Sequence, residues 1–191
     1  MRYNKPETFA IDWIRIRDGE ILKGEASENA SYFAYGAKVR SATGGRVVSV
    51  RNNMPDETPN FSGAHPPSVK GPEDFAGNHV VVRMRPGVYA LYAHLQPVSV
   101  DVRVGEEVAT GQFLGRLGNS GNTTLPHLHF GLSTGPDPLT SNSLPFVIDR
   151  YRLVGTADNS NLGSLEVPPI KGPSRDEQRT HPLSSSVADF R

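Results

Sequence analysis

Two histidines separated by one residue are the groups in this sequence best suited to chemistry. His127 and His129 flank Leu128 and follow a turn-forming run at 118–122. Side chains in a β-strand alternate between faces, so both rings would project from one side, roughly 6–7 Å apart along the strand. Imidazoles ligate metals and transfer protons, so the pair predicts a metal site or a catalytic pair. The alternative is two solvated strand histidines.

A third histidine, His94, ends a second β-rich segment. Residues 80–84 and 88–95 are rich in Val, Tyr and Ala and flank a Pro-Gly turn, which predicts a β-hairpin. Alternation along the second strand places His94 on the face of Tyr92. A lone histidine after an aromatic strand is often structural. Together with the His-x-His pair, however, it becomes a candidate third imidazole.

One carboxylate lies in an otherwise apolar segment. Residues 9–16 read Phe-Ala-Ile-Asp-Trp-Ile-Arg-Ile, a pattern that predicts a largely buried strand. Asp12 is the exception, and burying a carboxylate is costly unless it is paired, hydrogen-bonded or bound to a metal. A salt bridge to an arginine would satisfy it. The histidines favour the other solution, in which Asp12 is an anionic metal ligand.

The composition predicts an all-β protein with one core. The 191 residues include 19 Gly and 16 Pro, which indicate many turns and short strands. The chain has no cysteine, which excludes disulfides and thiolate metal sites. Lys+Arg and Asp+Glu both number 20, so no basic field favours nucleic acid as a partner. No apolar run is long enough to span a membrane, and we expect a monomer.

Two similar sequence patterns indicate a duplicated unit. Gly-x-x-Val occurs at 36–39 and at 105–108, each time followed by a glycine turn and a new apolar strand. We expect one domain over residues 1–155. Residues 156–191 begin with a stretch rich in Asn, Ser, Gly and Pro, which predicts an irregular tail with a returning strand near 187–190.

Four segments in order resemble the lysostaphin/LytM-type zinc metallopeptidases, which cut peptide cross-links in bacterial peptidoglycan. The segments are Tyr-Ala-His-Leu at 92–95, Val-Gly-Glu-Glu-Val-Ala-Thr-Gly-Gln at 104–112, Leu-Gly-Arg-Leu-Gly-Asn-Ser-Gly at 114–121 and His-Leu-His-Phe at 127–130. The resemblance extends from about residue 9 to residue 154 and rests on their combination. It implies a duplicated hybrid motif, an antiparallel β-sheet sandwich or barrel-like domain.

Carried over by position, the resemblance implies a role for each of four residues. Asp12 and His129 correspond to zinc ligands, and His94 and His127 correspond to the two catalytic histidines. The implied cofactor is zinc and the implied substrate is a peptidoglycan peptide. Zinc would polarise the scissile carbonyl while the two histidines act as acid and base, in an order that the sequence leaves open.

One expected ligand is missing from the pattern. The family has a further histidine, usually four residues before the aspartate, where this chain has Thr8, and no histidine precedes His65. The histidine could lie upstream of Met1, Glu7 or Thr8 could replace it, or the chain could be a degenerate, zinc-free module that binds the cell wall or regulates another hydrolase.

We favour the first explanation, because the sequence also lacks an apolar leader segment although a wall hydrolase needs export. We therefore expect an exported protein of the cell envelope or the extracellular space. We also expect this chain to bind zinc more weakly than one extended to include that histidine.

Overall fold

The regular elements of the protein are almost all β-strands, which confirms the all-β prediction. The structure, a computed structural model, describes residues 6–60, 62–63, 65–137, 139–157, 165, 167 and 169–190. Within those residues, no helix has the length and apolarity needed to cross a membrane. The elements are β1 (Ile11–Trp13), η1 (Asn29–Ser31), β2 (Lys38–Arg40), β3 (Gly45–Arg51), η2 (Pro72–Asp74), β4 (Asn78–Arg85), β5 (Val88–Leu95), β6 (Glu107–Val108), β7 (Phe113–Arg116), β8 (Leu128–Ser133), β9 (Ser143–Leu144), β10 (Ile148–Thr156), β11 (Arg175–Thr180) and β12 (Ser186–Asp189).

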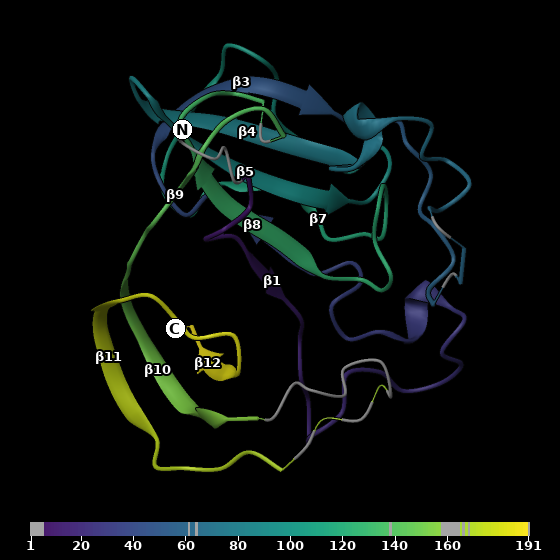
Figure 1. Ribbon diagram of the computed structural model, residues 1–191, viewed down its shortest axis with the longest axis vertical. Coiled ribbons are helices and arrows are strands. Elements are labelled where there is room, and N and C mark those ends of the chain that lie inside the picture. Colours follow the sequence, from purple (N-terminus) through teal and green to yellow (C-terminus); the bar gives the residue numbers. More distant parts are fainter. Residues whose placement is uncertain are drawn as a thin grey trace, which may run out of the picture.

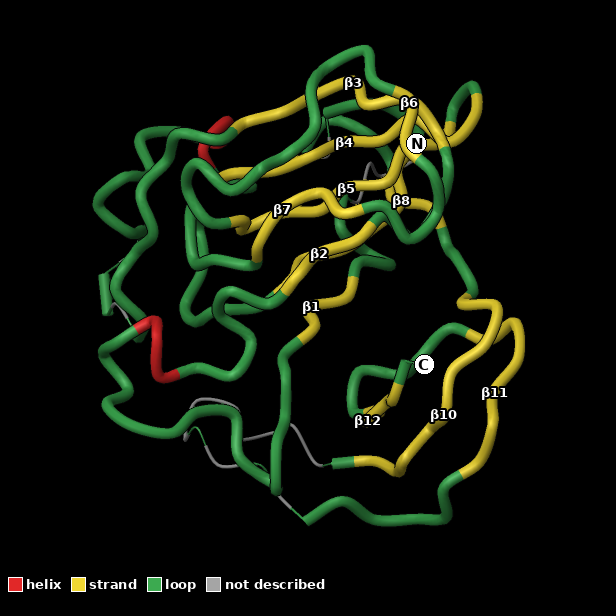
Figure 2. Tube along the Cα trace, turned by 180° about the vertical axis from the view of Figure 1, so that it is seen from behind, coloured by secondary structure: helices red, strands yellow, loops and turns green. Residues whose placement is uncertain are grey.

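Every strand pair is antiparallel, and the strands form three sheets. The main sheet has seven strands in the order β1-β8-β5-β4-β3-β6, with β9 paired to β8. Strands β2 and β7 form a two-stranded sheet, and β11-β10-β12 form a three-stranded one. The hairpin predicted around the Pro-Gly turn is confirmed as β4 and β5. In both views, β1 lies between the rest of the main sheet and the three-stranded sheet (Figures 1 and 2).

The core lies mainly on one face of the main sheet. Consecutive valines at 80–82 alternate in direction, so Val80 and Val82 join the larger buried cluster while Val81 joins a smaller one. The larger cluster also takes residues from β2 and β7, which cover that face. Its buried members are Ala34, Val39, Val47, Val80, Val82, Ala90, Tyr92, Leu95, Val102, Val108, Leu114 and Leu117. Within the described residues, the buried cluster on the opposite face is smaller and consists of Val81, Leu91 and Ala93, which leaves room there for polar side chains.

The predicted buried strand at 9–16 is wrong in extent and in burial. Strand β1 covers only Ile11–Trp13, and Asp12 is exposed. The cause is position, because β1 is the edge of the main sheet and pairs only with β8. Apolar residues on such a strand are covered from the side. Trp13 packs edge-on against Phe190, with ring centroids 5.2 Å apart.

The segment after residue 155 contains more regular structure than the sequence indicated. Strand β12 lies where the returning strand was expected. Strand β11 was not expected, because its sequence Arg-Asp-Glu-Gln-Arg-Thr lacks apolar alternation. Residues 158–164, 166 and 168 of the expected irregular tail lie outside the described residues. The domain boundary at 155 stays a prediction, and it falls within β10.

A buried carboxylate near the β4 end of the long β3–β4 connection links this connection to β3. Asp74 is only 6% exposed. Its Oδ1 lies 2.8 Å from Nη1 of Arg51, at the end of β3, and its Oδ2 accepts a hydrogen bond of 2.8 Å from the backbone N–H of Lys70. The Lys70 amide and then Arg51 hold the pKa of Asp74 below its usual value.

We expect Asp74→Asn to lower the free energy of unfolding by about 1–3 kcal/mol at neutral pH, because a charge-assisted pair is lost. A folded-state pKa below the ordinary 3.8 gives stability that is present above that value and is lost as the pH falls through the folded-state pKa. Denaturant unfolding from pH 7 to pH 3 should therefore show the two proteins converging at acid pH. The matched control, Asp101→Asn at an exposed turn, should track the wild type throughout, and a constant gap would contradict the assignment.

Candidate active site

Asp12 and His129 are brought together by strand register. Strand β8 is paired on one side with β1, where Asp12 lies opposite His129, and on the other side with β5, where Ala93 lies opposite His129. Directly opposed residues of antiparallel strands point to the same face. The Asp12 Oδ1 atom consequently lies 2.8 Å from His129 Nδ1. The predicted convergence of these two residues is confirmed.

His94 reaches the same face by a break in the alternation, which the sequence did not indicate. We expected His94 on the face of Tyr92, but that is the face of the main core, and it is Leu95 that enters the core beside Tyr92. The backbone at His94 has a φ of +61°, and the β4–β5 register shifts next to it, between Asn78 and Val80. A positive φ is unfavourable for any residue other than glycine. Here it turns the imidazole to the opposite face of the sheet.

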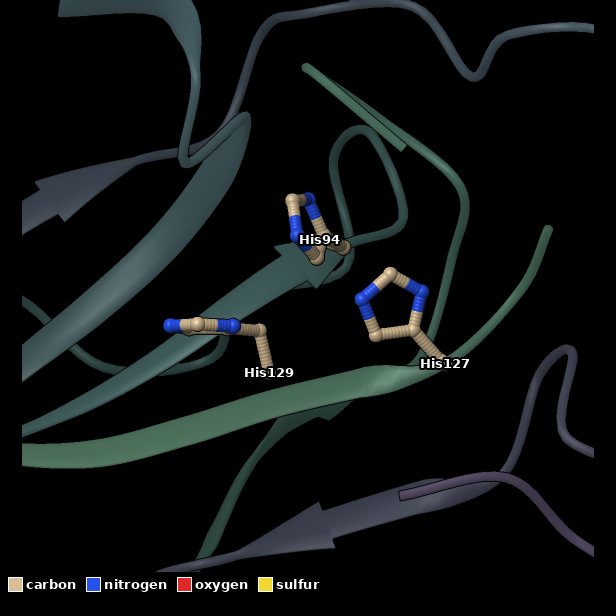
Figure 3. A group of neighbouring side chains, drawn as sticks. All are labelled: His94, His127 and His129. Carbon is tan, nitrogen blue, oxygen red and sulfur yellow. The ribbon is translucent and has the colours of Figure 1, made fainter. Parts of the chain in front are cut away.

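The three imidazoles form one compact cluster (Figure 3). The ring of His94 lies 4.6 Å from that of His127 and 5.9 Å from that of His129, centroid to centroid. One ring nitrogen from each histidine lies within 4.8 Å of the others. His94 is 5% and His127 is 9% exposed. All four residues singled out in the sequence therefore meet at one place.

Two backbone carbonyls determine which nitrogen of His94 and His127 faces the cluster. His94 Nδ1 lies 2.8 Å from the carbonyl oxygen of Ser120, and His127 Nδ1 lies 2.8 Å from that of Leu125. A carbonyl oxygen only accepts, so each Nδ1 carries the proton and donates it. In the neutral ring, Nε2 is then the basic nitrogen. Both histidines thus present Nε2 for proton transfer or metal binding.

The charges at the site balance around one carboxylate. Burial, then repulsion from His127 and His129, holds the pKa of His94 well below its usual value. Burial lowers the pKa of His129, but the hydrogen bond and charge of Asp12 outweigh it and raise that pKa overall. Partial desolvation raises the pKa of Asp12, yet the two histidines hold it well below its usual range. The Asp12 side chain is 63% exposed, so water screens part of this attraction.

The donor atoms fit a small divalent metal such as zinc. A tetrahedral ion with bonds of ~2 Å places neighbouring ligand atoms about 3.3 Å apart. The Asp12 Oδ1 atom lies 2.8 Å from His129 Nδ1 and 3.5 Å from His127 Nε2, on either side of that spacing. A carboxylate oxygen and imidazole nitrogens are also the donors that zinc prefers where thiolates are absent.

The missing histidine leaves a carboxylate near its place. Glu7 Oε1 lies 3.9 Å from His129 Nε2, and the Glu7 side chain is 53% exposed. That contact involves the ring nitrogen opposite the one that faces Asp12. At 3.9 Å the two atoms are too far apart for a hydrogen bond, so the contact is an electrostatic one. Glu7 is poorly placed to share an ion with Asp12.

Sequence reasoning missed the backbone groups of the site. The carbonyls of Ser120 and Leu125 hold two of the three imidazoles, but a carbonyl has no residue-type signature. The Thr123 hydroxyl, 3.3 Å from His127 Nδ1, was also missed. The signal for the first of these groups was the glycine-rich turn at 118–121, which contains Ser120 and contributed to the resemblance without a role of its own.

Comparison with known proteins gives one family match. Residues 30–141 match peptidase family M23, more than half of the chain. Peptidoglycan DD-endopeptidase ShyA of Vibrio cholerae is 31% identical over 123 residues, which are 63% of this chain and 24% of that protein. DD-carboxypeptidase/endopeptidase Mpg of Neisseria meningitidis is 35% identical over 75 residues, which are 39% of this chain and 17% of that protein. The chain thus spans a quarter or less of these curated relatives.

Among solved structures, the antimicrobial peptidase lysostaphin from Staphylococcus simulans matches with 23% identity and a TM-score of 0.39, over 57% of this chain and 38% of that chain. A zinc-containing peptidase from Vibrio cholerae matches with 25% identity and a TM-score of 0.40, over 58% of this chain and 26% of that chain.

We expect the proton of each neutral ring, His94 and His127, to be on Nδ1 in solution, because each Nδ1 faces a carbonyl. Long-range ¹H–¹⁵N correlation spectra of the imidazoles report which ring nitrogen is protonated. The matched control is the unfolded chain, in which the histidines are exposed to solvent and should show the usual mixture of the two tautomers. An Nε2–H signal from either residue would contradict the assignment.

Proposed function

Because this chain belongs to peptidase family M23, we propose that it is a zinc-dependent endopeptidase that hydrolyses peptide cross-links of bacterial peptidoglycan. The observation that supports this most strongly is the meeting of Asp12 and His129 with two further histidines on one face of the main sheet. Peptidoglycan lies outside the cytoplasm, so we also propose that the protein acts in the cell envelope or beyond it.

Asp12 and His129 would hold the metal. Their facing atoms already lie 2.8 Å apart, and each is fixed by its strand. When bound, zinc supplies a Lewis acid that polarises a carbonyl and lowers the pKa of water. His94 and His127 do the proton transfers, each through an Nε2 atom whose ring is held from behind by a carbonyl. One would accept a proton from the attacking water, and the other would donate one to the leaving amine.

A third protein ligand for the metal has still to be assigned. Thr8 stands where the resemblance places a histidine. His127 Nε2, 3.5 Å from Asp12 Oδ1, is a nitrogen within reach of the same ion. His127 therefore has two candidate roles, proton transfer or ligation, which mutation separates.

The alternative, a zinc-free module that binds the wall or regulates another hydrolase, requires the site to have decayed. A site that no longer binds zinc would gain nothing from a carboxylate and three imidazoles in contact, because burying these groups carries a desolvation cost. The kept cluster favours the enzyme.

The direct test is incubation of the purified chain with purified peptidoglycan, with and without added zinc. We expect the zinc-loaded protein to release new amino groups, and mass spectrometry of the fragments should show broken cross-links. A chelator should abolish the release, and zinc should restore it. Binding to peptidoglycan without any release, at full zinc occupancy, would support the regulatory alternative instead.

We expect His127→Ala to keep zinc and to lose cleavage by roughly 10²–10⁴-fold, the usual contribution of a general acid or base. His129→Ala should lose both, because a ligand itself is removed. Metal content and turnover measured on the two variants separate the roles. His65→Ala, at an exposed histidine in the β3–β4 connection, is the matched control and should change neither quantity. Loss of zinc from His127→Ala would make His127 the third ligand.

A further inference from the structure

One short segment holds both proton-transferring histidines. The Ser120 carbonyl that accepts from His94 and the Leu125 carbonyl that accepts from His127 are five residues apart, in the connection between β7 and β8. This connection contains no regular strand or helix between Arg116 and Leu128 apart from isolated bridges. Its geometry is fixed by hydrogen bonds to neighbouring segments, which come from backbone groups and from side chains.

Asp56, from the β3–β4 connection, fixes the first half of this segment. Its Oδ1 accepts a hydrogen bond of 2.7 Å from the backbone N–H of Asn119, and its backbone pairs with Ser120 in an isolated bridge. Gly118 makes the approach feasible, since a Cβ there would lie 2.6 Å from Asp56 Oδ1. The carbonyl that holds His94 thus belongs to the residue that directly follows Asn119 and that pairs with Asp56.

Tyr35 fixes the Asp56 carboxylate in turn. Its hydroxyl donates a hydrogen bond of 2.7 Å to Asp56 Oδ2. Burial, followed by the hydrogen bond and charge of Asp56, raises the pKa of Tyr35 to about 12, so the hydroxyl remains a donor at neutral pH. Both carboxylate oxygens are then engaged, one by a phenol and one by an amide.

Asn119 transmits the constraint to the second half of the segment. It is fully buried. Its Nδ2 donates to the Glu57 carbonyl at 3.0 Å, and its Oδ1 accepts from the Thr123 hydroxyl at 2.9 Å. The same hydroxyl lies 3.3 Å from His127 Nδ1. Hydrogen bonds, together with the covalent structure of Asn119 and Ser120, therefore connect Asp56 to both histidines.

We propose that Asp56 is a positioning residue that sets the tautomer and ring direction of His94, and through Asn119 and Thr123 those of His127. Its action is on the backbone that these rings contact. The proposal rests on the proposed function only for its effect on turnover. Its effect on the imidazoles is independent of any substrate.

Two substitutions at position 56 separate this role from a general contribution to folding. Alanine removes both hydrogen bonds. Asparagine keeps both, because its Oδ1 accepts from the Asn119 amide while its Nδ2 donates to the Tyr35 oxygen. Asp56→Ala should therefore release His94, and Asp56→Asn should rescue it. Asp101→Ala, at an exposed turn, is the control for loss of a carboxylate.

We expect the imidazole ¹⁵N spectra of Asp56→Ala to show His94 with both nitrogens partly protonated, while Asp56→Asn and Asp101→Ala keep the wild-type Nδ1–H signal. Zinc content, which depends on Asp12 and His129, should be unchanged in all three. With purified peptidoglycan as the substrate, kcat of Asp56→Ala should fall roughly 10–100-fold with little change in KM, because a displaced catalytic group slows chemistry more than binding. Asp56→Asn should recover most of it.

A wild-type His94 spectrum in folded Asp56→Ala would overturn the proposal, as would an Asp56→Asn variant that loses as much as the alanine variant. If Asp56→Ala does not fold, Tyr35→Phe removes one of the two contacts to the carboxylate and should give a partial change in the His94 signal; no change would overturn the proposal equally. If the wild type binds zinc but does not cleave peptidoglycan, the proposed function fails, and the tautomer comparison still decides the role of Asp56.

Discussion

Strand β8 is hydrogen-bonded on both sides, and this pairing brings together the strands that carry Asp12, His94 and His129. On one side its partner β1 places Asp12 opposite His129, and on the other side its partner β5 places Ala93 opposite His129 and carries His94 as the next residue. A shift of one residue in either register would turn the corresponding side chain to the opposite face. The large apolar cluster on the opposite face resists such a shift, since it would expose Tyr92 and Leu95. Packing on one face therefore sets the chemistry on the other.

The site also depends on having a single carboxylate beside several imidazoles. Three imidazoles lie close together, and Asp12 is the only carboxylate that the described contacts place within hydrogen-bonding distance of them. His94, which is buried deepest, responds by staying neutral, while His129 gains positive character beside Asp12. A bound divalent cation would neutralise the Asp12 carboxylate, which a proton on His129 does when no cation is bound. Neutral rings and one carboxylate are the state in which such a cluster is ready to receive a metal.

The sequence predicted those parts of the site that depend on residue type and on regular spacing. His127 and His129 were found because a period of two is the signature of a strand, and Asp12 was found because a carboxylate is rare in an apolar run. The face of His94 was wrong because its positive φ ends the alternation. The extent of β1 was wrong because an apolar pattern does not distinguish an edge strand covered from the side from a central one. The carbonyls of Ser120 and Leu125 were out of reach because any residue supplies a carbonyl, and only the fold shows which one a ring will meet.

The packing of Trp13 against Phe190 has a consequence for how such domains are delimited. The recognisable family match covers residues 30–141, yet Asp12 lies before it, and the strand that carries Asp12 is covered by an aromatic residue from the far end of the chain. The part that similarity detects most readily is therefore smaller than the part that can hold the site together. A fragment cut to the limits of the family match would keep the three histidines and lose Asp12, the carboxylate that β1 holds beside them. A fragment designed to carry this site into another protein must therefore include the segments before and after the family match.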